Sequence, residues 1–416
     1  LTLLPREGNY ELSRAEYQKA VEISHSLAVP RLRVEAYWGL SRAYGYQGDI
    51  ERATRNAELA IGIALKAGDE WIASLVRLTM GANLVQAGLY ESAAAWLKEA
   101  QRGFQECSDP FGTVAVRLWR CLSLFHQGEL ERLPGEMKEL VVGCRQNDYA
   151  FLFTRPTLLG PPSERELVPL LVMARDQDWE GSYARDLLRE IGLPDIRVHP
   201  GYQLRVYTLG AFHVWRGATQ ISKADWQRTK SRQLFQLFLT FHSTPLEREQ
   251  IFEYLWPGAS PEASDRNFKV ALSSLYRVLE PNRTAGSESA YIIRDDSRYY
   301  LRPEADFWLD VEEFTSLIQL GDSLLEGSPL QAITALEKAV ALYAGDYLPD
   351  IRYETWAATK REQLSVNYLQ AADHLCEHYL ANQNPEQVIQ LCQDIIAEDN
   401  CWERAYRHLM VAYDQL

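Results

Sequence analysis

Residues 261–280 read PEASDRNFKVALSSLYRVLE, and this stretch decides how the middle of the chain folds. Ser260 and Pro261 form a favourable N-cap and first-turn pair, which predicts a helix from here to about Glu280. Large apolar residues recur at the spacing of one helical face: Phe268, Leu272, Leu275 and Leu279. The opposite face carries Arg266, Val270, Ser273 and Arg277, with Asn267, Lys269 and Ser274 beside it. The stretch therefore predicts a helix that is anchored by one apolar stripe and presents basic and polar groups outward.

The flanking segments predict a small unit of strands and helices around this helix. LRVYTLGAFHVW (204–215) alternates as strands do, with a turn at Gly210, and RGATQIS (216–222) adds another strand. SRQLFQLFLTF (231–241) and EREQIFEYLW (247–256) have helical apolar faces. After a Gly- and Ser-containing link, YIIR (291–294) and RYYLR (298–302) predict a hairpin with Arg294, Arg298 and Arg302 around its tip.

The polar face of the third helix suits the major groove of DNA. Arg can bind guanine with two hydrogen bonds, Asn can pair with adenine, and Ser can reach bases or phosphates. A basic hairpin would meet the backbone or the minor groove. For any single Arg, an ordinary solvated helix face is the simpler interpretation, but the whole order of elements is much harder to obtain by chance.

Glycines in the first third of the chain indicate a repeat of forty residues. Gly8, Gly48, Gly88 and Gly128 hold the same position in successive units. Small or apolar residues follow each glycine at two fixed offsets, namely Ser13, Ala53, Ala93 and Leu133, then Ala20, Ala60, Ala100 and Leu140. A Gly that ends one helix, followed by small residues that let the next helix pack closely, predicts a stack of antiparallel helix pairs similar to tetratricopeptide repeats. The alternative is an irregular helical bundle.

Residues 204–302 resemble the OmpR/PhoB-type winged helix, through LFQLFLTF, REQIFEYLWPG and FKVALSSLYRVLE at its three helices. The resemblance implies that Ser273 to Arg277 read the groove, that Lys230 touches phosphate, and that the hairpin clamps the flanking DNA. Tyr276 stands where the family pattern often has Arg, so Arg277 must carry that contact.

The C-terminal part resembles the bacterial transcriptional activation domain, itself a tetratricopeptide variant. The signatures are YAGDYLPD (343–350), YETWA (353–357), REQL (361–364) and ERAYRHLM (403–410). A winged helix joined directly to this domain is the arrangement of the Streptomyces antibiotic regulatory protein (SARP) family. The resemblance implies binding to direct repeats in promoters and contact with RNA polymerase. Larger members of the family add a nucleotide-binding STAND module and sensor repeats.

Charge and composition restrict the other functions. The net charge of −14 argues against a chain that coats nucleic acid along its length, whereas residues 203–305 alone carry 14 Lys and Arg against 11 Asp and Glu. The six cysteines form no C-x-x-C pair and are typical of a reducing cytoplasm. No apolar run approaches a membrane span, and the first residues do not form a signal peptide. The start without Met, partway through a repeat, leads us to expect a fragment of a longer protein.

No motif predicts an enzyme, a cofactor or a metal site. The chain has no G-x-x-x-x-G-K-[ST] phosphate loop and no G-x-S-x-G nucleophile elbow. His374 and His378 share a helical face but lack the glutamate of H-E-x-x-H, so a solvated face is favoured over zinc.

The sequence thus predicts a mainly α protein with four parts: tetratricopeptide-like repeats (1–147), a helical extension (148–202), a winged helix-turn-helix (203–304) and an activation domain (305–416). The predicted function is that of a cytoplasmic, sequence-specific DNA-binding activator that recruits RNA polymerase, with a protein or small-molecule effector on the repeats. The predicted DNA contacts are Lys230, Arg266, Asn267, Lys269, Ser273, Ser274, Arg277, Arg294 and Arg298. Two alternatives remain, a protein-interaction scaffold and the C-terminal part of a STAND signalling ATPase.

Overall fold

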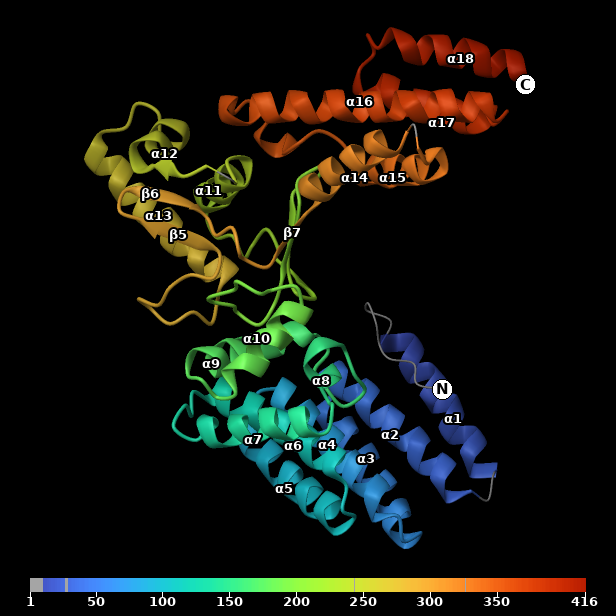
Figure 1. Ribbon diagram of the computed structural model, residues 1–416, viewed down its shortest axis with the longest axis vertical. Coiled ribbons are helices and arrows are strands. Elements are labelled where there is room, and N and C mark those ends of the chain that lie inside the picture. Colours follow the sequence, from blue (N-terminus) through green and yellow to red (C-terminus); the bar gives the residue numbers. More distant parts are fainter. Residues whose placement is uncertain (1–9, 27–28, 243, 326) are drawn as a thin grey trace. The chain divides into compact units, whose positions relative to one another are not determined.

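The protein is mainly α-helical, as the sequence predicts, and its contacts divide it into two compact units. The computed structural model describes residues 10–26, 29–242, 244–325 and 327–416 (Figure 1). Unit 1 comprises residues 1–201 and unit 2 residues 202–416. Within the described residues, no helix combines the length and the apolar character needed to cross a membrane.

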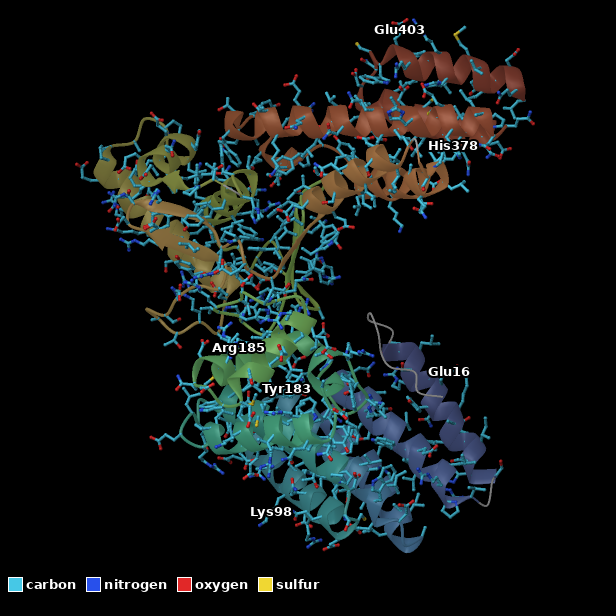
Figure 2. All side chains as sticks on the ribbon, in the orientation of Figure 1. Glu16, Lys98, Tyr183, Arg185, His378 and Glu403 are labelled. Atoms are coloured by element: carbon cyan, nitrogen blue, oxygen red, sulfur yellow. The ribbon has the colours of Figure 1, made fainter. Side chains whose placement is uncertain are left out.

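Unit 1 begins with a stack of antiparallel helices, α1 to α7, in which each helix packs on the next. Its helices are α1 Tyr10–Ser26, α2 Pro30–Tyr46, α3 Ile50–Lys66, α4 Glu70–Gln86, α5 Tyr90–Glu106, α6 Pro110–Gln127, α7 Leu133–Gln146, α8 Phe151–Thr154, η1 Glu164–Leu167, α9 Val168–Asp176 and α10 Gly181–Glu190. Exposed polar side chains such as that of Lys98 project from its outer surface (Figure 2).

The predicted repeat is confirmed at the glycines and the small or apolar residues of its second, third and fourth units, whereas Ala20 of the first unit is only half-buried. Gly48, Gly88 and Gly128 follow α2, α4 and α6 with φ between 72° and 76°, a left-handed conformation that favours glycine. The small and apolar residues of the following helices are fully buried, namely Ala53, Ala60, Ala93, Ala100, Leu133 and Leu140. Gly8, the first glycine of the series, lies outside the described residues.

Unit 2 begins with a winged helix built from two small sheets and three helices. The strands are β1 Leu204–Tyr207, β2 His213–Arg216, β3 Thr219–Gln220, β4 Leu246–Glu247, β5 Ile292–Asp295, β6 Arg298–Leu301 and β7 Phe307–Leu309. The helices are α11 Thr229–Thr240, α12 Arg248–Leu255 and α13 Pro261–Leu279. One sheet has the order β3-β2-β1-β7, in which β1 and β7 are parallel, and the other has the order β4-β6-β5.

The C-terminal helical region follows β7 without a linker. It contains α14 Asp310–Leu324, α15 Pro329–Leu342, η2 Pro349–Ile351, η3 Thr355–Ala357, α16 Ala358–Ala381, α17 Pro385–Glu398 and α18 Glu403–Gln415. Consecutive α-helices pack against one another as helix pairs. This is the helical-repeat architecture that the sequence predicts for the region.

Asp310 joins the winged helix to the helical region. The side chain is buried, and its two oxygens accept hydrogen bonds from the backbone nitrogens of Thr208 (2.5 Å) and Leu209 (2.8 Å) and from the Thr208 hydroxyl (2.7 Å). Nearby, Gly210 donates to the Asp346 carbonyl over 2.9 Å. A Cβ on Gly210, whose φ is +88°, would lie 2.9 Å from the Ala344 carbonyl oxygen. The two parts of unit 2 are therefore closely joined through the turn that follows β1.

Candidate nucleic-acid interface

The orientation of α13 is set by the apolar stripe that the sequence predicts. Phe268, Leu272, Leu275 and Leu279 are all buried, so this prediction is confirmed. The Phe268 ring lies 4.9 Å from the ring of Tyr299 on β6 and 5.8 Å from that of Phe252 on α12. Helix α13 also packs against α11. Contacts on several sides thus fix which residues of α13 face solvent.

The outward face of α13 is basic and polar. The exposed residues are Arg266, Asn267, Lys269, Val270, Ser273 and Arg277. Lys269 forms an ion pair with Asp265 over 2.8 Å, whereas no described carboxylate lies within ion-pair distance of Arg266 or Arg277. These two guanidinium groups are therefore available to an external acceptor.

Ser274 does not face outward, so that prediction is wrong. Its side chain is only 1% exposed, and its hydroxyl has no hydrogen-bond partner among the described residues. The reason is that Ala271 and Val278, three residues before it and four after it, are also buried. The buried face of α13 is thus wider than the four large apolar residues suggest, and Ser274 lies on its flank.

The β5–β6 hairpin places Arg294 and Arg298 at an exposed tip, as the sequence predicts. Arg294 donates to the Asp296 carbonyl over 3.3 Å, and Arg298 pairs with Asp295 over 2.5 Å. Arg302, in contrast, is not near the tip. It is 2% exposed and pairs with Glu288 (2.6 Å) and with Glu304. Arg302 directly follows β6 and therefore lies at the base of the hairpin, where it binds these two acidic residues.

A hollow of about 390 Å³ lies between α13 and the hairpin, and most of its charged lining is basic. Its cations are Arg248, Lys269, Arg277, Arg283 and Arg294, and its one carboxylate is Asp265. A hydrogen bond from Lys269 lowers the pKa of Asp265, so this carboxylate stays ionised and offsets part of the positive charge.

Two of these cations were not among the predicted contacts. Arg248 begins α12 and approaches α13 through an ion pair with Asp265 over 3.2 Å. Arg283 follows α13 and lies 4.3 Å from the centre of the Tyr276 ring. Burial raises the pKa of Tyr276, which keeps this phenol neutral beneath the guanidinium. Lys230, the second residue of α11, is half-buried and does not line the hollow.

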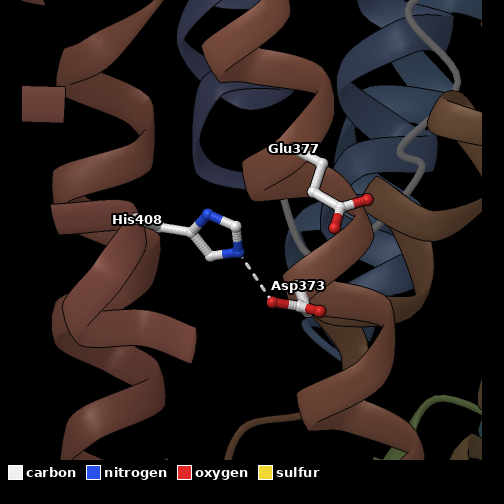
Figure 3. A group of neighbouring side chains, drawn as sticks. All are labelled: Asp373, Glu377 and His408. Atoms are coloured by element: carbon white, nitrogen blue, oxygen red, sulfur yellow. Dashed lines mark hydrogen bonds and ion pairs between the residues drawn. The ribbon is translucent and has the colours of Figure 1, made fainter. Parts of the chain in front are cut away.

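A second group of polar residues lies in the C-terminal region, where Asp373 and Glu377 on α16 face His408 on α18 (Figure 3). Asp373 is 1% exposed; one of its oxygens bonds to His408 over 2.7 Å, and the other pairs with Arg404. Since Arg404 already neutralises Asp373, we interpret the group as a link between α16 and α18. His378 lies on α16 (Figure 2), beside Asn382.

The architecture of unit 2 is that of a winged helix-turn-helix joined directly to a helical-repeat domain. Residues 309–416 match the family BTAD, the bacterial transcriptional activator domain. This part of the chain is thus similar to a domain of bacterial transcriptional activators, and the order of the two domains agrees with the SARP-type resemblance seen in the sequence.

Among solved structures, the chain is similar to Mycobacterium tuberculosis EmbR, described as in complex with a low-affinity phosphopeptide. The two are 18% identical, the match covers 51% of this chain and 55% of that chain, and the TM-score is 0.44. The chain thus matches about half the length of that protein. No curated protein matches the sequence.

Proposed function

We propose that the chain is a sequence-specific transcriptional activator that binds double-stranded promoter DNA through α13 and the β5–β6 hairpin. The observation that carries the proposal is the basic hollow between these two elements. Helix α13 is anchored on one side and exposes Arg266 and Arg277, neither of which forms an ion pair with a carboxylate of the described residues. A helix of this kind fits the major groove, while a basic hairpin beside it reaches the adjoining backbone.

The exposed residues suit different contacts. Arg277 can bind the O6 and N7 atoms of guanine with two hydrogen bonds, and Asn267 can do the same with adenine. Arg266, Lys269 and Ser273 would contact bases or phosphates beside them. Arg294 and Arg298 would bind backbone phosphates, with Arg298 exchanging Asp295 for a phosphate. Lys230 would contact phosphate outside the hollow.

The remaining parts of the chain are assigned by their fold and by the family match. We assign residues 1–147 to an effector-sensing repeat domain, 148–202 to a helical extension, 203–304 to the DNA-binding domain and 305–416 to the activation domain. The activation domain would contact RNA polymerase in the cytoplasm and would help to arrange the protein on direct repeats. The family match at residues 309–416 supports this assignment.

The proposal is tested by selecting bound sequences from random DNA duplexes and then measuring the affinity of Arg277→Ala for the selected site. Loss of a two-bond guanine contact should cost about 1–3 kcal/mol and should relax the preference at one base pair. Arg102→Ala removes an exposed cation from α5 and serves as the matched control. Raising the salt concentration should also weaken binding. The logarithm of the association constant should fall with the logarithm of the salt concentration, with a slope of roughly −0.9 for each phosphate contact. Selection of no sequence would contradict the proposal and favour a protein-binding winged helix.

A further inference from the structure

One face of the unit 1 repeats is partly covered by the chain's own segment 155–163, which follows α8. The Leu159 carbonyl accepts a hydrogen bond of 2.6 Å from the indole nitrogen of Trp119 on α6. Leu159 is buried, and its neighbours lie against residues of α2 and α4. Just beyond this segment, Gln86 donates to Glu166 of η1 over 2.8 Å. The face formed by α2, α4 and α6 thus binds an irregular, proline-containing peptide segment.

The covered stretch continues into an open hollow of about 500 Å³ between α1 and α2. Leu158, from the covering segment, forms part of its wall. Most of the remaining lining is apolar or aromatic, contributed by Tyr17, Ala20, Ile23, Leu32, Ala36 and Trp38. Ile23 and Leu32 are 61% and 44% exposed, although apolar residues of this size are usually buried. The volume is within the range of ligand-binding pockets.

Arg42 lines both the covered stretch and the open hollow. It is only 6% exposed, and its Nη2 atom has no hydrogen-bond partner among the described residues. Glu35 also lines the hollow, but it is half-exposed and already pairs with Arg31 over 3.1 Å. The Arg42 guanidinium lies 5.9 Å from the centre of the Tyr46 ring, but within the described residues no oxygen accepts a hydrogen bond from Nη2. A buried guanidinium nitrogen without an acceptor is unfavourable, so this atom favours a ligand that brings an anionic acceptor.

We propose that this hollow binds an extended peptide segment of a partner protein that carries an acidic side chain next to an apolar one. The carboxylate would bind Arg42, and the apolar side chain would enter the hollow beside Trp38 and Leu158. Segment 155–163 shows that the adjoining surface already binds a peptide through a side-chain donor and a backbone carbonyl. This inference concerns unit 1 and does not depend on DNA binding.

The test uses the full chain and fluorescein-labelled octapeptides of Leu and Pro in which each position in turn is Asp or Asn. Fluorescence anisotropy should find at least one Asp peptide that binds roughly tenfold or more tightly than its Asn twin, the ratio expected for one charge-assisted hydrogen bond. Arg42→Met should reduce this ratio to about one, and Arg42→Lys should keep part of it. Arg55→Met, which removes an exposed cation of α3, should leave the ratio unchanged.

Stability measurements separate ligand binding from a structural role of Arg42. Because Met removes a buried charge whose Nη2 has no hydrogen-bond acceptor among the described residues, yet can still pack on the Tyr46 ring, Arg42→Met should unfold at the same temperature as the parent chain or at a higher one. A large fall in that temperature would indicate an internal partner for Arg42 and would overturn the proposal. Equal binding of all Asp and Asn twins, or an unchanged ratio in Arg42→Met, would also overturn it. Free glutamate should not displace the labelled peptide when it is added at the peptide concentration that gives half-saturation. Displacement would also overturn the proposal, since it would show that the hollow binds a small anion rather than a peptide.

Discussion

Asp310→Ala should destabilise the winged helix although Asp310 lies outside it, at the first position of α14. The carboxylate accepts hydrogen bonds from two backbone nitrogens and one hydroxyl in the turn after β1, and it is 1% exposed. Alanine would leave these donors buried without acceptors, at about 1–3 kcal/mol each. Burial also raises the pKa of Asp310, which indicates that desolvation of the carboxylate offsets part of this energy. We therefore expect a net loss of about 3–5 kcal/mol, the usual cost of removing one partner from a buried charged group.

Native-state hydrogen exchange is the suitable assay, because it reports opening free energies separately for each part of a chain with two units. In Asp310→Ala, the amides of β1 and β2 should exchange more than a hundredfold faster, whereas those of α4 and α5 should be unchanged. Asp322→Ala removes an exposed carboxylate from the same helix and should change neither set. A loss below about 1 kcal/mol in β1, or a loss confined to the first turn of α14, would refute the hydrogen-bond argument.

Three further predictions address other buried polar groups. Ser274→Ala should keep or slightly raise stability and leave DNA affinity unchanged, because the hydroxyl is buried and has no partner in the part of the chain that the structure describes. Weaker DNA binding in this variant would restore Ser274 as a contact. Burial raises the pKa of Glu280, so the contribution of Glu280 to the free energy of unfolding should increase as the pH falls from neutrality through that pKa. In Glu280→Gln, the free energy of unfolding measured with urea should therefore change less over this pH range. A stronger dependence of the free energy of unfolding on pH in Glu280→Gln would contradict the expected direction of this effect. Asp373→Ala should cost about 1–3 kcal/mol and speed exchange in α18 while leaving α14 protected, and zinc should not stabilise the parent chain; stabilisation by zinc would show a metal site instead.

The sequence predicted the orientation of α13 well, because large apolar residues at helical spacing leave only one face to bury. It failed at Ser274, since a small polar residue fits either side of a helix and only the packing against neighbouring elements shows which. Arg302 was misplaced for a related reason: its acidic partners, Glu288 and Glu304, are charged residues that carry no sign of their pairing in the sequence.

Other features depend on tertiary contacts that leave no periodic signal. Arg248 and Arg283 reach the basic hollow only because α12 and the link after α13 fold toward the hairpin. Asp310 and Asp373 read as ordinary acidic residues of amphipathic helices, and their burial becomes visible only in the folded chain.

The parallel pairing of β1 with β7 has a practical consequence for anyone who shortens this chain. A DNA-binding piece that ends at residue 304 would lack β7, and the outer edge of β1 would then present unpaired N–H and C=O groups to solvent. Such open edges promote association between molecules. The piece would also lose the acceptor that Asp310 provides. Insoluble or self-associating material from that truncation would thus reflect the missing strand. A longer piece that continues through α14 should cover the edge of β1 again and prevent this association.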